Sequence, residues 1–274
     1  MMGRMDVLLD LARAAADVDG VEPFNEATRI ALREGDEATV LETFELGGRV
    51  VAGAVAFGDA PAELVVHPSY RRQGLGAGLW RHVAKAGTGR VWAHGDLPGA
   101  RGLASKVRLR PVRTLLVLRL SLGDESPLES VPDGVTIRAF RAEDADAVVA
   151  VNGRAFASHP EQGAMDRADF DRRAAEAWFD PAGLFVAERA DGTVVGFHWT
   201  KVEDGVGEVY VVGVDPDAHG GGLGTALTAR GLRHLHEQGL RTVDLYVEGD
   251  NAPALAVYHR LGFVEHARDV LYGA

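Results

Sequence analysis

The chain repeats itself once, over a distance that suits two domains. Residues 66–76, VHPSYRRQGLG, align with residues 214–224, VDPDAHGGGLG, at a constant offset of 148 residues. Both copies follow a run of β-branched residues and precede a helical pattern. A solenoid repeats every 20 to 50 residues or so, so this long repeat predicts two copies of one domain within 274 residues.

A short segment between the copies has the composition of a linker. Residues 122–134, LGDESPLESVPDG, are rich in turn-forming and acidic residues, which favours an exposed connection. We therefore expect an N-terminal domain at residues 1–121 and a C-terminal domain at residues 135–274.

Periodicity and turn residues predict the elements of the second copy. They are strand 135–139, helices 142–156 and 167–178, a hairpin of strands 184–188 and 193–201, strand 208–214, helix 222–238, strand 242–248, helix 252–261 and strand 263–271. The first copy has the same order, but it begins with helix 6–16 and lacks the opening strand. Strands mixed with helices predict an α/β (α+β) fold on a mixed sheet.

Composition excludes several function classes. The net charge of −11 argues against broad nucleic-acid or anionic-membrane binding, which needs a basic face. No cysteine is present, so disulfides, thiolate nucleophiles and cysteine metal sites are excluded. We expect a cytoplasmic protein because neither a signal peptide nor a membrane span is evident, and we expect a monomer. The histidines show no spacing typical of a metal site; His234 and His236, two apart on a helix, face different ways.

Each glycine-rich segment opens a predicted helix. A helix N-terminus offers unpaired N–H groups and a positive dipole end, and glycines let a phosphate approach them closely. An alternative is that the glycines only make a tight turn. The spacing fits neither a P-loop nor a dinucleotide fingerprint. The candidate pyrophosphate cradles are Arg72, Gln73, Gly74, Leu75, Gly76 and Ala77 in the first copy, and His219, Gly220, Gly221, Gly222, Leu223, Gly224 and Thr225 in the second.

These segments resemble the cofactor-binding motif of the GNAT family of N-acetyltransferases. Residues 71–76, RRQGLG, fit the motif directly, and residues 219–224, HGGGLG, fit except at the first position, where histidine replaces arginine or glutamine. Asn251, Ala254, Tyr258, Gly262 and Phe263 have the spacing of the family's last helix and strand. The resemblance covers nearly the whole chain, twice. It implies two tandem GNAT domains, each a mixed, mostly antiparallel sheet flanked by helices, with acetyl-CoA as cosubstrate and no metal.

The resemblance also implies cofactor contacts outside the cradles. A bulge is expected in the strand before the second cradle, whose backbone would pair with the pantetheine arm. The implied contacts are Leu64, Val65 and Val66 in the first copy, and Val212, Gly213, Val214, Asn251, Ala252, Pro253, Ala254, Leu255 and Ala256 in the second.

The family's catalytic positions are filled only in the second copy. Amide formation needs a base for the amine proton and benefits from an acid at the leaving sulfur. The resemblance assigns these roles to Glu208 and Tyr258. The aligned residues of the first copy are Ala60 and Ala104, so we expect it to bind acetyl-CoA without turnover. The alternatives are that Glu208 is an ion-paired strand carboxylate and that Tyr258 is a core aromatic.

Longer segments resemble a tandem branch of this family that acetylates the cysteine amine of cysteinyl-glucosaminyl-inositol. They are residues 62–68, 92–95, 159–163, 176–181, 196–201 and 208–216. The substrate contacts implied are Glu26, Glu161, Lys201, Glu208 and Tyr246. Two alternatives stay open, namely transfer to another small amine or a protein N-terminus, and a module that binds acetyl-CoA without chemistry.

Overall fold

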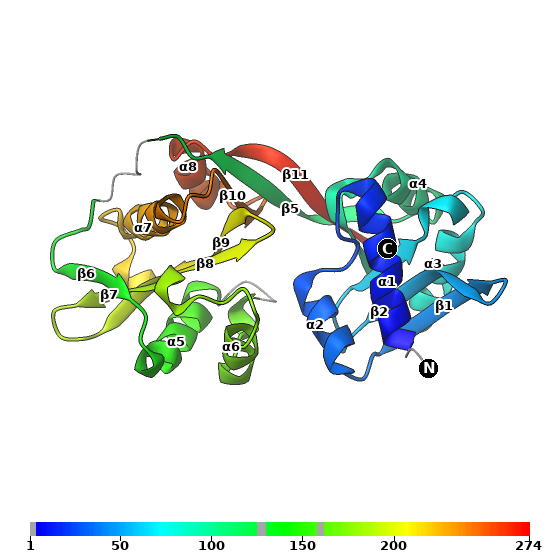
Figure 1. Cartoon of the computed structure of the whole chain (residues 1–274), viewed down its shortest axis with the longest axis horizontal. Helices are drawn as coiled ribbons and strands as arrows, with labels where there is room; N and C mark the ends of the chain where they lie inside the picture. Colours follow the sequence, from blue (N-terminus) through cyan, green and yellow to red (C-terminus); the bar gives the residue numbers. More distant parts are fainter. Residues whose placement is uncertain (1–3, 125–129, 158–161) are drawn as a thin grey trace. The chain divides into compact units, whose positions relative to one another are not determined.

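The computed structural model describes residues 4–124, 130–157 and 162–274. The chain forms two compact units (Figure 1). The first contains Met1–Leu116, Glu248–Asp250 and Ala267–Ala274, and the second contains Val117–Val247 and Asn251–His266. Their boundary falls within two long strands, so each unit is completed by the end of a strand that begins in the other.

The first unit opens on helices, so the absence of an opening strand is confirmed. Its elements are α1 (Arg4–Asp19), α2 (Glu26–Glu34), β1 (Val40–Leu46), β2 (Arg49–Ala56), β3 (Ala62–Val66), α3 (Leu75–Lys85), β4 (Arg90–Ala93), α4 (Pro98–Lys106) and the first part of β5 (Arg110–Ser121). Residues 267–273 of β11 (Val264–Gly273) join this sheet.

The sheet of the first unit has the order β1-β2-β3-β4-β11-β5 and helices on both faces. The pairs β1/β2, β2/β3 and β4/β11 are antiparallel and β3/β4 is parallel. Leu8 and Leu11 of α1 pack with Val55 and Val65 on one face. The residues on the other face include Leu79 and Val83 of α3, Ala104 of α4, and Ala52 and Ala54 of β2.

Each helix and strand expected in the second half is present, with ends shifted by a few residues. The elements are β6 (Val135–Ala139), α5 (Ala145–Ala155), α6 (Arg167–Ala174), β7 (Leu184–Arg189), β8 (Val194–Glu203), β9 (Val206–Val214), α7 (Leu223–Glu237), β10 (Thr242–Glu248), α8 (Ala252–Arg260) and the start of β11. The predicted helix 142–156 begins with a 3-10 turn, and the predicted helix 167–178 ends at Ala174.

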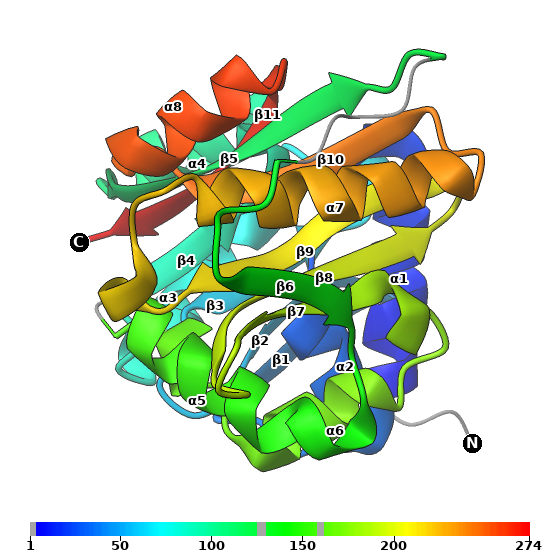
Figure 2. The same cartoon turned by 90° about the vertical axis from the view of Figure 1, so that its left-hand side faces the viewer.

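The sheet of the second unit is covered by α7 on one face and by α5 and α6 on the other (Figure 2). Its order is β5-β10-β9-β8-β7-β6, in which β9/β10 is parallel and β6/β7, β7/β8 and β8/β9 are antiparallel. Leu223 and Leu227 of α7 pack on one side, and Val148 and Phe170 pack near Trp199 on the other. The mixed, mostly antiparallel sheet flanked by helices is confirmed.

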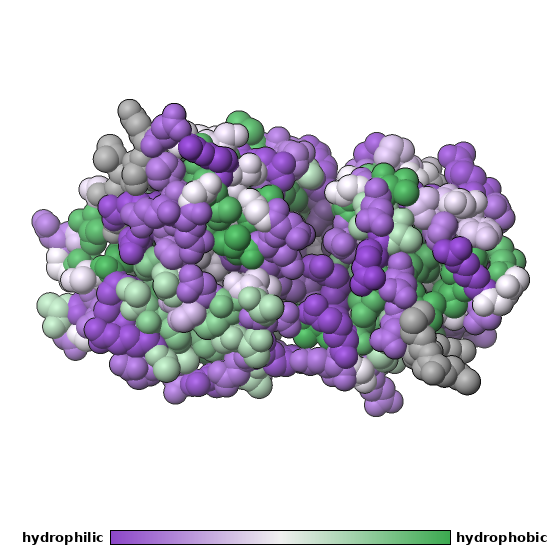
Figure 3. All heavy atoms as spheres, in the orientation of Figure 1, coloured by the Kyte–Doolittle hydropathy of each residue, from purple (hydrophilic) through white to green (hydrophobic). Residues whose placement is uncertain are grey.

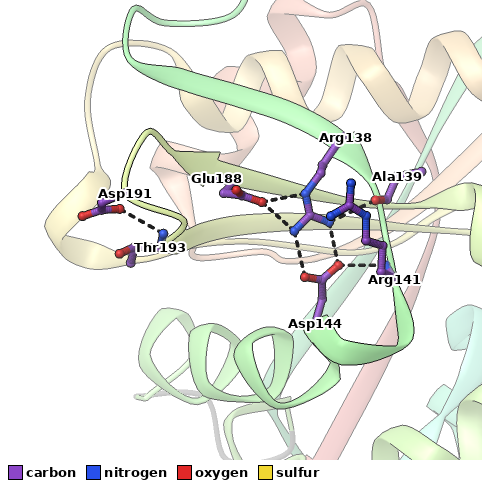
Figure 4. Close-up of polar contacts among 7 residues, drawn as sticks. All are labelled: Arg138, Ala139, Arg141, Asp144, Glu188, Asp191 and Thr193. Carbon is purple, nitrogen blue, oxygen red and sulfur yellow. Dashed lines mark hydrogen bonds and ion pairs between the residues drawn. The ribbon is translucent and has the colours of Figure 1, made fainter.

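A partly buried ion network fixes the opening strand of the second unit (Figure 4). Arg138 of β6 donates to both carboxylate oxygens of Asp144, at 2.6 and 2.8 Å, and to Glu188 of β7 at 2.6 Å. The hydrogen bond from Arg138 lowers the pKa of Asp144. At the tip of the β7–β8 hairpin, the Asp191 carboxylate accepts from the Thr193 N–H at 2.9 Å, as a turn aspartate does.

Hydrophilic residues are spread over both units on the face drawn in Figure 3. Among the described helices, none combines the length and the apolar composition that crossing a membrane requires.

His198 is an uncharged histidine in the core of the second unit. Its side chain on β8 is completely buried under α7, where a Cβ at Gly231 would lie 2.0 Å from the ring. Neither ring nitrogen has a hydrogen-bond partner among the described residues. Burial, with a smaller effect of His234, lowers the pKa of His198 to about 3.

This buried histidine makes the second unit sensitive to acid. In the unfolded chain His198 takes up a proton near pH 6.5, whereas the folded ring stays neutral down to about pH 3. The free energy of unfolding therefore falls by up to about 1.4 kcal/mol for each pH unit below 6.5. In denaturant titrations between pH 7.5 and 5, His198→Leu should weaken this dependence, whereas His266→Leu, at an exposed position, should leave it unchanged. Equal pH dependence in all three proteins would contradict the assignment.

Candidate functional site

Three consecutive glycines precede α7 in the left-handed region of the backbone. Gly220, Gly221 and Gly222 have φ of 96°, 61° and 85°. Residues with a Cβ avoid this region, and a Cβ at Gly220 or Gly222 would meet nothing within 4 Å. Gly222 is the N-cap of α7 and no side chain caps the helix. The first turn thus offers open backbone N–H groups, which suits a phosphate.

The histidine that departs from the motif makes the same loop contact as the arginine of the first copy. Nε2 of His219 donates to the Val214 carbonyl at 3.1 Å, and Nε of Arg71 donates to the Val66 carbonyl at 3.1 Å. The four residues match pairwise at the 148-residue offset. Either side chain therefore ties the start of the loop back to the end of its strand. Arg71 also pairs with Asp19 at 2.6 Å.

A cavity of about 350 Å³ extends from the second cradle between β9 and α8. Most of the cofactor contacts implied for the second copy line it. They are Val212, Gly213, Val214, His219, Gly220, Gly222, Leu223, Gly224, Thr225, Asn251, Pro253 and Ala254. Gly221, Ala252, Leu255 and Ala256 do not line it. The Asn251 side chain accepts from the Ala254 N–H at 3.2 Å and so caps α8.

Sequence patterns miss four further lining residues, Ala155, Phe156, Thr228 and Val257. Thr228 lies one turn beyond the cradle, and its hydroxyl donates to the Gly224 carbonyl at 2.8 Å. Helical spacing could have identified Thr228 and Val257. Ala155 and Phe156 come from the end of α5, far away in the sequence, and no motif marks them.

The bulge expected in β9 is present at Tyr210. Trp199 of β8 pairs with Val211, and the next residue, Thr200, pairs with Val209. The extra residue breaks the alternation of faces. Val212 and Val214 pack with α7, whereas Tyr210 and Val211 pack around Trp199 on the opposite face.

Register brings Glu208 close to two of the implied substrate contacts. Glu208 pairs with Lys201 of β8 and with Asp244 of β10, two residues before Tyr246. Paired residues share a face, so these side chains emerge on the face away from α7. Lys201 is buried, with Nζ 3.2 Å from a carboxylate oxygen of Glu203 and 5.0 Å from the centre of the Trp178 ring.

Tyr258 of α8 lines the cavity, and its ring also packs edge-on against Phe263 at 5.9 Å. Burial raises the pKa of its hydroxyl to about 12. The group keeps its proton at neutral pH and can donate it. Glu208 is not among the lining residues of this cavity.

The first unit repeats the glycine-capped helix start but lacks counterparts of Glu208 and Tyr258. Gly74 is the N-cap of α3 with φ of 86°, and Arg72 has φ of 63°. Ala60 and Ala104 stand where the second copy has Glu208 and Tyr258, and Ala104 is buried. Glu26 is the first residue of α2, in the first unit, and Glu161 lies outside the described residues.

A buried carboxylate–imidazole–carboxylate network lies near Glu26 in the first unit. His94 bonds to Glu63 through Nε2 and to Asp269 through Nδ1, the latter at 2.9 Å. Glu63, 1% exposed, also accepts from the Asn25 N–H at 3.0 Å. Burial alone would lower the pKa of His94, but the hydrogen bonds with Asp269 and Glu63 outweigh it and raise the pKa to about 10. Sequence reasoning missed this network, because Asp269 reaches it from the far end of the chain.

The chain matches the acetyltransferase (GNAT) family at residues 6–106 and again at residues 153–263. The chain belongs to this family. The two matched segments contain one cradle each, so the cradles belong to tandem GNAT domains.

Curated relatives match almost the whole chain. The mycothiol acetyltransferase of Clavibacter michiganensis is 50% identical over 97% of this chain and 90% of its own length. That of Thermomonospora curvata is 51% identical over 97% of this chain and 92% of its own length. A solved tandem GNAT protein from the clavulanic acid biosynthesis pathway is 24% identical, with a TM-score of 0.73 over 99% of this chain and 94% of its own, which shows the fold.

This membership makes the protein an acyltransferase that uses acetyl-CoA. The cavity fits that cosubstrate, because an uncapped helix start can hold phosphates and an apolar wall continues along β9. Among the described residues, no group of three or more His, Asp or Glu is arranged to hold a metal ion.

The cradle can be tested with two glycines of matched geometry. Gly222 and Gly192 have φ of 85° and 86°, and a Cβ at either would meet nothing within 4 Å. Alanine at either position should cost about 1 kcal/mol of stability. Only Gly222→Ala should also weaken acetyl-CoA binding, by about tenfold or more in calorimetry, because its methyl group stands between the phosphates and the N–H groups. Equal affinity of the two variants would contradict a phosphate site here.

The ion network of the first unit should stabilise it most at low pH. Because the folded pKa of His94 lies near 10, its stabilising effect is complete below pH 6.5 and is lost as the pH approaches 10. His94→Gln should destabilise the protein by about 3 kcal/mol at pH 6, and by much less at pH 10, in urea titrations. His82→Gln, which removes a surface pair with Glu42, should cost less than about 1 kcal/mol. A pH-independent effect of His94→Gln would show that the imidazolium is not the stabilising species.

Proposed function

We propose that this protein transfers the acetyl group of acetyl-CoA to the cysteine amine of cysteinyl-glucosaminyl-inositol, giving mycothiol and CoA. One observation carries the proposal: the mycothiol acetyltransferases are about half identical to this chain over nearly its whole length. We place the reaction in the cytoplasm. We also propose that the protein acts as a monomer, because a single chain supplies the cradle, the base and the acid.

Glu208 is the proposed general base. Its carboxylate shares a sheet face with Lys201, and it lies on β9, the strand that also carries the cavity wall at Val212–Val214. Lys201 is buried and pairs with Glu208 across β8 and β9, so a basic side chain stands beside the proposed base. The amine loses its proton to Glu208 and attacks the thioester carbon. The alternative of a purely structural carboxylate predicts no effect on the rate of transfer.

Tyr258 is the proposed general acid. Tyr258 lines the cavity, and its hydroxyl keeps its proton at neutral pH. When the carbon–sulfur bond breaks, this proton passes to the sulfur, so that CoA leaves as a thiol. Packing against Phe263 holds the ring in place and is compatible with this role.

The backbone of the second unit positions the cosubstrate. Residues 219–225 would hold the pyrophosphate and Val212–Val214 would pair with the pantetheine arm. A backbone N–H at this strand can stabilise the negative charge that develops on the thioester oxygen.

Glu26, Glu161, Lys201 and Tyr246, together with Glu208, are the proposed contacts to the acceptor. A sugar-inositol is rich in hydroxyl groups, which carboxylates bind well. Tyr246 is half-exposed, and Lys201 and Glu208 pair across the strands β8 and β9.

The two halves have different proposed roles. Residues 1–121 form a GNAT domain that binds acetyl-CoA through Leu64, Val65, Val66 and residues 72–77 without turnover, and residues 135–274 form the catalytic domain, with 122–134 as the connection. Support comes from the alanines at positions 60 and 104 and from the intact glycine cap of α3.

The first experiment is an acetylation assay read by mass spectrometry, because a thiol dye would also detect the thiol of the substrate. The wild type should add one acetyl group to the amine. Glu208→Gln should lower kcat/KM by about 10²- to 10⁴-fold, since proton transfer by a positioned group contributes about that much. Tyr258→Phe should lower kcat, and Glu237→Gln, at an exposed position, should be neutral.

Each negative result has a definite meaning. A fully active Glu208→Gln variant would show that Glu208 is not the base. An unchanged kcat in the Tyr258→Phe variant would show that Tyr258 is not the acid. If the wild type binds acetyl-CoA but does not acetylate this substrate, the acceptor is another amine.

A further inference from the structure

Phe156 forms a wall of the cavity from an element unrelated to the cofactor motif. It follows the last residue of α5 and lines the same cavity as Gly213 of β9 and Tyr258 of α8. It is the largest apolar side chain among the lining residues. An aromatic ring at this position restricts what the cavity can hold.

Gly213 allows this ring to lie close to the strand. A Cβ at Gly213 would stand 2.7 Å from Cε1 of Phe197 and 3.4 Å from Cε2 of Phe156. Any side chain there would therefore push against two aromatic rings. Because Gly213 has no side chain, the Phe156 ring can close the cavity directly against the backbone of β9.

The backbone of Phe156 cannot recede easily. Its N–H donates to the Asn152 carbonyl at 2.9 Å, and its carbonyl lies so near Gly163 that a Cβ there would be 2.1 Å away. Asn152 is completely buried and donates to the Gln162 carbonyl at 2.6 Å, while Gln162 donates back to the Asn152 side chain at 3.0 Å. Contacts at both its N–H and its carbonyl therefore hold the backbone of Phe156 in place.

The position of the wall along β9 decides which part of the cosubstrate it meets. The cradle follows the end of β9, so the path from Val214 to Val212 leads away from the phosphates. Under the proposed function the thioester lies at this far part of the cavity, near Tyr258. Phe156 faces the strand at Gly213 and so stands beside the reacting end.

We propose that Phe156 determines acyl-group specificity by limiting the transferred group to acetyl. This inference rests on the proposed function. A fixed aromatic wall rejects added methylenes because neither the ring nor the strand behind it can move to make room. A pocket of this kind separates substrates that differ by one methylene by about 10- to 200-fold.

The test compares acetyl-, propionyl- and butyryl-CoA at a saturating concentration of the amine. In the wild type, kcat/KM should favour acetyl- over propionyl-CoA by about 10- to 200-fold. Phe156→Ala should lower this ratio by about tenfold or more, and Phe156→Leu should give an intermediate ratio. Phe179→Ala is the matched control, because Phe179 packs on Trp199 at 5.5 Å in the same core and does not line the cavity.

Two results would overturn the inference. One is a Phe156→Ala variant that still transfers acetyl with an unchanged acyl ratio; the other is a change confined to the KM of the amine, which would place the ring against the acceptor. If Phe156→Ala does not fold, Phe156→Leu decides by the same ratio.

Failure of the proposed function is a separate outcome. It would appear as no acetyl transfer to this amine by the wild type. Calorimetry of acetyl- and butyryl-CoA binding then tests the wall alone. Phe156→Leu should narrow the difference in Kd between the two, and an unchanged difference would overturn the inference.

Discussion

The second unit depends on one extra residue in β9. Strict alternation would place Glu208, Val212 and Val214 on one face of the sheet. The bulge at Tyr210 instead leaves Glu208 opposite Lys201, on the face of Trp199, while Val212 and Val214 pack with α7. A single strand thereby presents Glu208 on one face and Val212 and Val214, at the start of the cofactor path, on the other. In the proposed mechanism the base takes the amine proton, whereas the cosubstrate follows the strand backbone beyond the bulge.

The loop that follows β9 depends on a contact that two different side chains can make. Arg71 and His219 each donate to the carbonyl that ends the preceding strand. Their shared function is to fix where the loop begins, and the positive φ of the residues after them then sets its path. In the first copy Arg72 and Gly74 have positive φ and Gln73 does not, whereas all three glycines of the second copy have positive φ. The two loops therefore share the contact at the strand end but differ in backbone conformation at the middle position.

Local patterns predicted most of the fold and much of the candidate site. Hydrophobic periodicity and glycine positions identify helices and strands, and the cradle residues adjoin one another in the sequence, so Gly220 and Gly222 could be assigned in advance. Phe156 could not, because only packing brings the end of α5 to Gly213. The exchange of strand ends could not be predicted either. Pairing of β11 with β4 joins residues about 180 positions apart, and no local signal encodes such a contact.

The two copies differ most in where their acidic residues lie and in what those residues contact. In the first unit, Glu63 and Asp269 hold a protonated His94 between them, away from solvent. Each carboxylate already accepts a hydrogen bond from this imidazolium, so neither is a good base for an incoming amine. In the second unit, Val211 takes the position of Glu63, and the carboxylate stands three residues earlier, at Glu208. The acidic residue thus moves along the strand, past the bulge, from a position that stabilises the fold to the position of the proposed base. The same architecture thus supports a closed ionic core in one copy and the proposed catalytic site in the other.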